Sequence, residues 1–436
     1  MVDHDHGRPR STMVNESHTS LTMVDHGRPQ SHDHHHHGCF DQCDLSHECQ
    51  EVVDDIESQL IETESDTTET TFNDIKPIAP TDLQVTAAAL YSLTVSWTAP
   101  SSGAVTSYTV TLKEDTITKD TKRGVTETTT TFDSLTAGTK YTVEVVSVAG
   151  VLTSGGQSSD SPLPGNFYTK PNKAKNLAVS VRTVSSLTVT WDAGEGENTG
   201  FTVQLGSGTE VPVIKGTTGT YTFNNLTAGL EYTVTVVTKS GDQTSTDLTG
   251  SFQTKPNKAK NLAVSVRTVS SLTVTWDASE GENTGFTVQL GSGTEVPVTK
   301  GTTGTYTFNS LTAGKEYTVT VVTKSGDQTS TDLTGSFRTM PMNVIDLTHG
   351  DIGQSFINLK WTKPPGLYSS FKIVYGKTGQ SSVTVNVGDV QQREINNLTP
   401  GTTYTMTVFT LRGYDCSSGS SIDFTTASLE PTLEAR

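Results

Sequence analysis

An internal repeat constrains this chain more than any other feature of its sequence. The segment PNKAKNLAVSVRTVSSLTVTWDA begins at Pro171 and begins again at Pro256, 85 residues later. A repeat of this length has the size of a small domain, so we expect an array of similar domains. The two copies differ only at the pairs Gly194/Ser279, Ile214/Thr299, Asn225/Ser310, Leu230/Lys315, Gln253/Arg338 and Lys255/Met340.

More divergent segments flank these copies, and every unit carries one tryptophan at the same place. The four tryptophans are Trp97, Trp191, Trp276 and Trp361. We predict a leader at 1–77, four units at 78–170, 171–255, 256–340 and 341–427, and a tail at 428–436. Pro171, Pro256 and Pro341 stand at the joints, where proline ends a strand because it lacks the N–H donor of a β-ladder.

Hydrophobic and polar residues alternate within each unit. In the second unit Leu187, Val189 and Trp191 alternate with polar residues, and the segment from Tyr232 to Val236 does the same. A period of two indicates strands with one buried face. Turn clusters such as GEGENTG and KSGDQTSTD separate about seven short strands per unit, and no segment has helical periodicity. The predicted fold class is all-β, with each unit a two-sheet β-sandwich.

Each unit also contains the motif L-T-x-G-x-x-Y. Its Leu/Tyr pairs are Leu135/Tyr141, Leu226/Tyr232, Leu311/Tyr317 and Leu398/Tyr404, with a tryptophan 41 to 44 residues before each tyrosine. This corner resembles the fibronectin type III pattern, an immunoglobulin-like sandwich, over about residues 78–427. The resemblance implies that these tryptophans and tyrosines form the structural core, with each tyrosine hydroxyl bonded to nearby backbone.

The leader differs from the rest of the chain in composition. Residues 1–37 hold nine of the 11 histidines, residues 41–74 hold twelve acidic residues, and the net charge is -17. Such a segment cannot bury a core, so we expect a disordered His-rich and then acidic leader. The histidines at 34–37 with Cys39, Cys43, His47 and Cys49 could bind zinc or copper. Their spacing matches no known zinc module, so the preferred interpretation has no metal and no cofactor, and it leaves the state of these cysteines and of Cys416 open.

Residues with catalytic chemistry are scarce between 78 and 427. His349 and Cys416 are the only histidine and cysteine there, and triads or three-ligand metal sites need more. Glu195 and Glu197 are interpreted as solvated turn charges. We predict a chain that is no enzyme and, being acidic, no partner of nucleic acid. It has neither the ~20 apolar residues of a membrane span nor the apolar core of a signal peptide, so we expect both to lie outside this sequence.

Two kinds of binding or modification site are predicted. Asn225 and Asn397 begin N-glycosylation sequons, and strand alternation beside an inward leucine would turn each asparagine to solvent. Ser310 replaces Asn225 in the other copy. Arg412, Gly413 and Asp415 resemble an integrin-binding tripeptide interrupted by Tyr414 and form a candidate ligand loop, but the default interpretation is a solvated turn.

The leading functional interpretation is a non-catalytic extracellular or cell-surface adhesion array that binds extracellular or cell-surface proteins. Residues 391–409 and the Thr-rich corners resemble ectodomains of receptor-type tyrosine phosphatases of the eta and H kind. That resemblance implies a parent whose membrane span and phosphatase domain are not in this chain. The alternatives are a structural matrix spacer of the tenascin or fibronectin type, and an accessory array on a secreted bacterial hydrolase.

Overall fold

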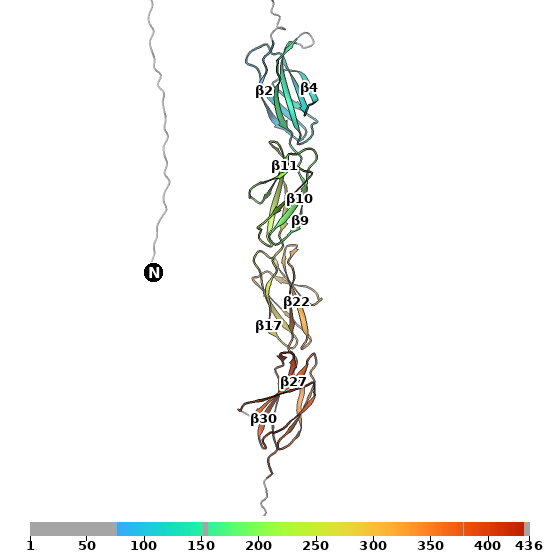
Figure 1. The fold of residues 1–436 in the computed structure, drawn as a ribbon, viewed down its shortest axis with the longest axis vertical. Coiled ribbons are helices and arrows are strands. Elements are labelled where there is room, and N and C mark those ends of the chain that lie inside the picture. Colours follow the sequence, from blue (N-terminus) through green and yellow to red (C-terminus); the bar gives the residue numbers. More distant parts are fainter. Residues whose placement is uncertain (1–75, 151–155, 378, 431–436) are drawn as a thin grey trace, which may run out of the picture. The chain divides into compact units, whose positions relative to one another are not determined.

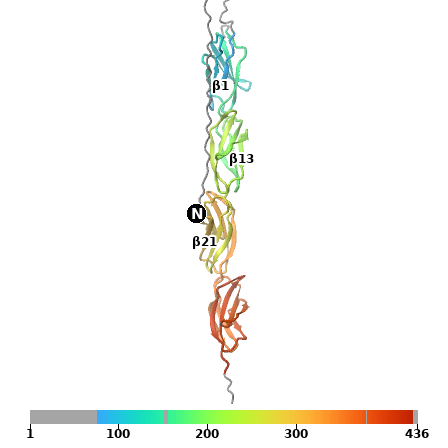
Figure 2. The ribbon, with the colours of Figure 1, turned by 90° about the vertical axis from the view of Figure 1, so that its left-hand side faces the viewer.

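The computed structural model describes residues 76–150, 156–377 and 379–430. All regular secondary structure assigned there is β-strand (Figure 1, Figure 2). The strands form four successive groups of eight within the unit 70–436, and we call these groups domains 1 to 4. The predicted all-β class is therefore confirmed.

The strands are as follows. Domain 1 comprises β1 (Thr81–Ala88), β2 (Leu93–Thr98), β3 (Ser107–Glu114), β4 (Ile117–Val125), β5 (Thr129–Phe132), β6 (Lys140–Ala149), β7 (Gln157–Ser158) and β8 (Leu163–Tyr168). Domain 2 comprises β9 (Lys175–Arg182), β10 (Leu187–Asp192), β11 (Gly200–Leu205), β12 (Val211–Ile214), β13 (Thr218–Phe223), β14 (Glu231–Ser240), β15 (Gln243–Thr244) and β16 (Leu248–Gln253). Domain 3 comprises β17 (Lys260–Arg267), β18 (Leu272–Asp277), β19 (Gly285–Leu290), β20 (Val296–Thr299), β21 (Thr303–Phe308), β22 (Glu316–Ser325), β23 (Gln328–Thr329) and β24 (Leu333–Arg338). Domain 4 comprises β25 (Ile345–Ile352), β26 (Ile357–Thr362), β27 (Ser370–Lys377), β28 (Val383–Val387), β29 (Gln392–Ile395), β30 (Thr403–Arg412), β31 (Asp415–Cys416) and β32 (Ser420–Thr425).

Every domain packs a three-stranded antiparallel sheet against a five-stranded one. In domain 2 the smaller sheet has the order β13-β10-β9, and the larger has the order β12-β11-β14-β15 with β16 also paired to β14. The same order recurs in the other three domains. Each domain therefore has one strand more than the expected seven, because the hairpin after its longest strand adds a two-residue strand such as β15.

Each domain has its own core between the two sheets. In domain 2 the indole of Trp191 packs edge-on against Phe201, with ring centroids 5.7 Å apart and planes at 77°. Gly219 pairs with Trp191 across the strands, and a Cβ on this glycine would overlap the indole. Trp276 packs in the same way against Phe286, opposite Gly304. Alternation thus places the large rings inside, and a glycine on the hydrogen-bonded neighbouring strand leaves space for each indole.

Candidate interaction surfaces

The four tryptophans expected in the structural core are all buried. Trp97, Trp191, Trp276 and Trp361 are 4%, 1%, 1% and 4% exposed. Tyr141 and Tyr404 are also buried, whereas Tyr232 and Tyr317 are half-buried. In domain 3 the Lys315 ammonium lies over the Tyr317 ring, 5.2 Å from its centroid. The rings of the two middle corners therefore lie nearer to solvent than those of the outer two.

The hydroxyl of each of these tyrosines accepts a backbone hydrogen bond from the threonine five residues earlier. The donors are Thr136, Thr227, Thr312 and Thr399, at 3.0, 2.8, 2.8 and 3.0 Å. Burial opposes ionisation of Tyr404, but the hydrogen bond with Thr399 favours the phenolate, and the pKa of Tyr404 lies below its ordinary value. The bond closes the loop of each L-T-x-G-x-x-Y motif and so fixes the turn between the two sheets.

Asn225 and Asn397 have exposed side chains, but not because of strand alternation. Each follows the end of a strand and has left-handed backbone, with φ of 58° and 64°. Ser134 and Ser310 occupy the equivalent place, both at φ 57°. Asparagine tolerates this conformation better than most residues, because its short polar side chain bonds locally. The alternation argument was therefore wrong about the local geometry, since a turn residue stands where a strand residue was expected.

The turn containing Arg412, Gly413 and Asp415 is not a free loop. Both Nη atoms of Arg267 in domain 3 donate to the carboxylate of Asp415, and Nη1 of Arg338 lies 3.7 Å from it. The Asp415 side chain is only 20% exposed, whereas Tyr414 at the tip is fully exposed. The carboxylate that an integrin-binding tripeptide would need is thus engaged within the chain. Sequence alone could not show this, because Arg267 and Asp415 are 148 residues apart.

The alanine of each L-T-A-G corner touches the next domain. Glu197 N–H donates to the Ala137 carbonyl at 2.9 Å, and the same bond joins Glu282 to Ala228 at 2.8 Å and Leu367 to Ala313 at 2.9 Å. The following glycine of each corner, at Gly138, Gly229 and Gly314, has a positive φ, and a Cβ there would overlap the carbonyl oxygen of the same residue of the next domain. The motif glycine therefore serves the joint as well as the turn, a role that sequence reasoning missed.

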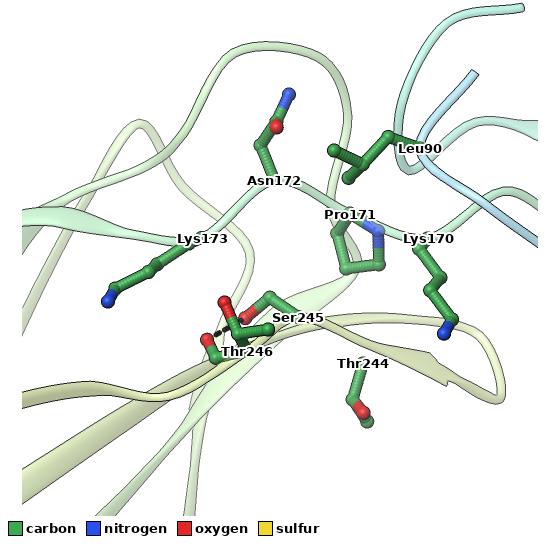
Figure 3. A pocket seen from close by; sticks show the side chains of 8 residues that line it. All are labelled: Leu90, Lys170, Pro171, Asn172, Lys173, Thr244, Ser245 and Thr246. Atoms are coloured by element: carbon green, nitrogen blue, oxygen red, sulfur yellow. Dashed lines mark hydrogen bonds between the residues drawn. The ribbon is translucent and has the colours of Figure 1, made fainter.

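Grooves lie at the first and third joints between domains. At the first joint a groove of about 360 Å³ is lined by Leu90, residues 170–173 and residues 244–246. Figure 3 shows Leu90 beside Pro171, with Ser245 and Thr246 opposite, where the Ser245 hydroxyl donates to the Thr246 carbonyl at 2.9 Å. A larger groove of about 680 Å³ at the third joint is lined by Arg267, Met340, Met342 and their neighbours. Methionine and arginine are enriched at protein interfaces, so the groove at the third joint has the composition of a contact surface.

Metal ligands and membrane-spanning helices were two further features to locate in the described residues. Within residues 76–150, 156–377 and 379–430, no group of three or more His, Cys, Asp and Glu is arranged to hold a metal ion. The ligands considered in the leader, at 34–37, Cys39, Cys43, His47 and Cys49, lie outside the described residues. Cys416 is a free thiol on β31 in the described part of the chain. That part also contains no helix long and apolar enough to cross a bilayer.

Comparison with known proteins gives three informative relatives. The rabbit (Oryctolagus cuniculus) collagen alpha-1(XII) chain is 29% identical over 319 residues, covering 70% of this chain and 48% of the collagen. Tenascin-R of Gallus gallus is 27% identical, covering 64% of this chain and 21% of the tenascin. Receptor-type tyrosine-protein phosphatase H of Homo sapiens is 28% identical, covering 77% of this chain and 31% of the phosphatase. The chain thus spans about half of the first relative and less than a third of the other two.

The family model of the fibronectin type III domain matches residues 78–162, 170–251, 255–336 and 343–422. These four matches fall on domains 1 to 4 in order. The resemblance to phosphatase H falls on this repeat region. The chain therefore belongs to the fibronectin type III domain family, which it carries as four tandem copies.

Proposed function

We propose that this chain is a non-catalytic adhesion and recognition array, part of the ectodomain of a receptor of the receptor-type tyrosine phosphatase kind. The observation that carries the proposal is the run of four family domains shared with a receptor-type phosphatase over 355 residues. Its partners are extracellular or cell-surface proteins, and its location is extracellular or at the cell surface. The membrane span and any phosphatase domain belong to a longer parent.

The paired carboxylates of Glu195 and Glu197 support this proposal. Glu195 and Glu197 are exposed, and Glu197 pairs with Lys215 at 2.8 Å. The backbone of Glu197 bonds to domain 1, and the carbonyl of Glu195 accepts from Asn172 at 2.8 Å. These residues hold a turn and a joint in place, so we assign them a structural role.

A bead-binding assay tests the proposal. Beads carrying the full chain are applied to intact cells and to decellularised matrix. We expect saturable attachment to cells that is lost after the cells are treated with trypsin, because the partner is a surface protein. Attachment that resists trypsin but is lost with glycosidases, or no attachment to cells, would contradict the proposal.

A structural matrix spacer is the alternative, and the similarity to a collagen chain and to tenascin-R is consistent with it. In this alternative the domains separate other modules, and the joint contacts limit how neighbouring domains move. The same assay distinguishes the two, because a matrix component should hold the beads on decellularised matrix and not on trypsin-sensitive cell sites.

We further propose that Asn225 and Asn397 carry N-linked glycans while the matching site in domain 3 carries none. Both asparagines are exposed turn residues, and the sequon threonines Thr227 and Thr399 follow in the same corner. Glycopeptide mass spectrometry on chain secreted from eukaryotic cells should find both sites occupied. Ser310→Asn supplies the matched control, since Ser310 has the same φ and should become glycosylated. Empty sites in exported protein would remove the residue-level support for an extracellular role.

A further inference from the structure

One strand position lies against the next domain at all three joints. The last residue of the final strand is Tyr168 in domain 1, Gln253 in domain 2 and Arg338 in domain 3. A Cβ added to the turn glycine of the following domain would overlap Tyr168 at Gly241 and Gln253 at Gly326, and at Gly413 would lie 3.0 Å from Nη1 of Arg338. The same place thus holds an aromatic ring, an amide and a guanidinium, each facing the next domain.

At the second joint, the position that ends the last strand carries an uncharged side chain, Gln253. The Gln253 amide donates to the Ser325 hydroxyl and to the Gly229 carbonyl, both at 2.8 Å. Ser325 also donates to the Gly229 carbonyl at 2.7 Å. Arg182 lies beside them, but its Nη1 donates to the Gln253 carbonyl at 2.7 Å. Uncharged acceptors therefore satisfy every donor named here.

The third joint is ionic at the same place. Arg267, the counterpart of Arg182, donates from both Nη atoms to Asp415. Nη1 of Arg338 lies 3.7 Å from the same carboxylate and donates to the Arg412 carbonyl at 3.4 Å, while its Nη2 donates to Glu316 of its own domain at 2.9 Å. The side chains of Arg267 and Arg338 are each 28% exposed. Gln328 occupies the place of Asp415 in domain 3, as the second residue after the turn glycine. Domain 4 therefore offers an acid where domain 3 offers an amide.

Domains 2 and 3 are nearly identical, so the few positions at which they differ can be compared directly. The two domains share nearly all their residues, yet Gln253/Arg338 and Lys255/Met340 differ next to the joint. We propose that the residue ending the last strand selects the domain that follows, so that Arg338 fits domain 3 to a neighbour carrying Asp415. It follows that the third joint weakens with salt while the second does not, because screening acts on the partly exposed ion pairs.

Hydrogen exchange at two equivalent amides in the full chain tests this. Leu367 N–H bonds to Ala313 across the third joint, and Glu282 N–H bonds to Ala228 across the second. Both amides are protected only while their joint is closed. Raising NaCl from about 0.05 M to 1 M should speed exchange at Leu367 by about threefold and leave Glu282 unchanged. Equal salt responses at the two amides would overturn the proposal.

Substitutions then separate the roles of the charges. Arg338→Gln supplies the residue that the near-identical domain 2 already carries, so domain 3 should still fold. It should speed exchange at Leu367 in low salt and reduce the salt effect, because the Arg267–Asp415 pair remains. Asp415→Asn removes the partner of both arginines, so it should abolish most of the salt effect. Unchanged exchange at Leu367 in both variants would count against a selecting role.

A transplant of the ion pair provides the strictest test. Gln253→Arg alone should speed exchange at Glu282, because Gln328 offers the guanidinium no carboxylate. Adding Gln328→Asp should slow it again and make the second joint salt-sensitive, with Arg182 already in the place of Arg267. If the double variant stays as open as Gln253→Arg, or closes without salt dependence, the proposed selection rule is wrong.

Discussion

Single residues decide how each sandwich is filled. The indole of Trp191 occupies space that Gly219 leaves free on the next strand, and Phe201 closes it from the other sheet. The tryptophan was identifiable from its recurrence in four units. The glycine opposite was not singled out, because its role depends on a pairing between residues 28 positions apart in the sequence.

Trp191→Ala should destabilise domain 2 by about 3 to 5 kcal/mol, because it removes a fully buried ring and leaves a cavity. Hydrogen exchange in the full chain measures this domain by domain. Peptides containing Ile214 report domain 2 and those containing Thr299 report domain 3, so the copy is an internal control. Unchanged protection in domain 2 would show that the indole contributes little to its core.

Tyr232→Phe should destabilise domain 2 by about 1 kcal/mol, because the Thr227 amide loses its acceptor. The ring is half-buried, so water can replace part of the bond and the loss stays well below that of the tryptophan. Tyr317→Phe should cost domain 3 the same, because its geometry matches. Exchange of the Thr227 and Thr312 amides checks both, and no change at either would contradict a role for the hydroxyl.

At the level of strands and turns, sequence patterns were informative where side chains alternate. Alternation from Leu187 to Trp191 predicted a half-buried strand, which β10 is. The turn conformations were harder to predict, because residues with left-handed backbone such as Asn225 follow a strand without interrupting its alternation of polar and apolar residues. A corner asparagine or serine before L-T-x-G is consistent with that conformation, but alternation alone does not reveal it.

The corner glycine allows a matched pair of substitutions. Gly229 and Gly206 both have positive φ, but a Cβ on Gly229 would overlap the Glu282 carbonyl, whereas a Cβ on Gly206 meets nothing within 4 Å. Both alanine variants should destabilise domain 2 by about 1 to 2 kcal/mol through backbone strain. Only Gly229→Ala should also raise exchange at the Glu282 amide. Equal exchange there in the two variants would mean that the joint tolerates a side chain.

For the molecule as a whole, the four-domain array was predictable and the joints were not. Repeats and prolines indicate where one unit gives way to the next. The contacts across a joint join residues that are far apart in sequence, such as Ser240 and Gly138 at a separation of 102. No local pattern records which loop of one domain meets which corner of its neighbour.

Removal of residues 1–75 should leave the unfolding of the four domains unchanged to within about 0.5 kcal/mol, because that acidic and His-rich composition offers little to bury. Lys76 is kept, since it pairs with Asp160 in domain 1. Calorimetry of the full and shortened chains compares them directly. A lower transition after removal would indicate that the leader stabilises the first domain.

Domains 2 and 3 present matching strands in the same register. For example, β14 pairs with β16 through Tyr232 and Phe252, and β22 pairs with β24 through Tyr317 and Phe337. During refolding, a strand from one neighbour fits the vacant place in the other, which creates a kinetic trap with exchanged strands. Pulling single refolded molecules would reveal it as one rupture that releases twice the usual chain length. The near-identity of adjacent copies therefore carries a hazard during folding that the divergent outer domains avoid.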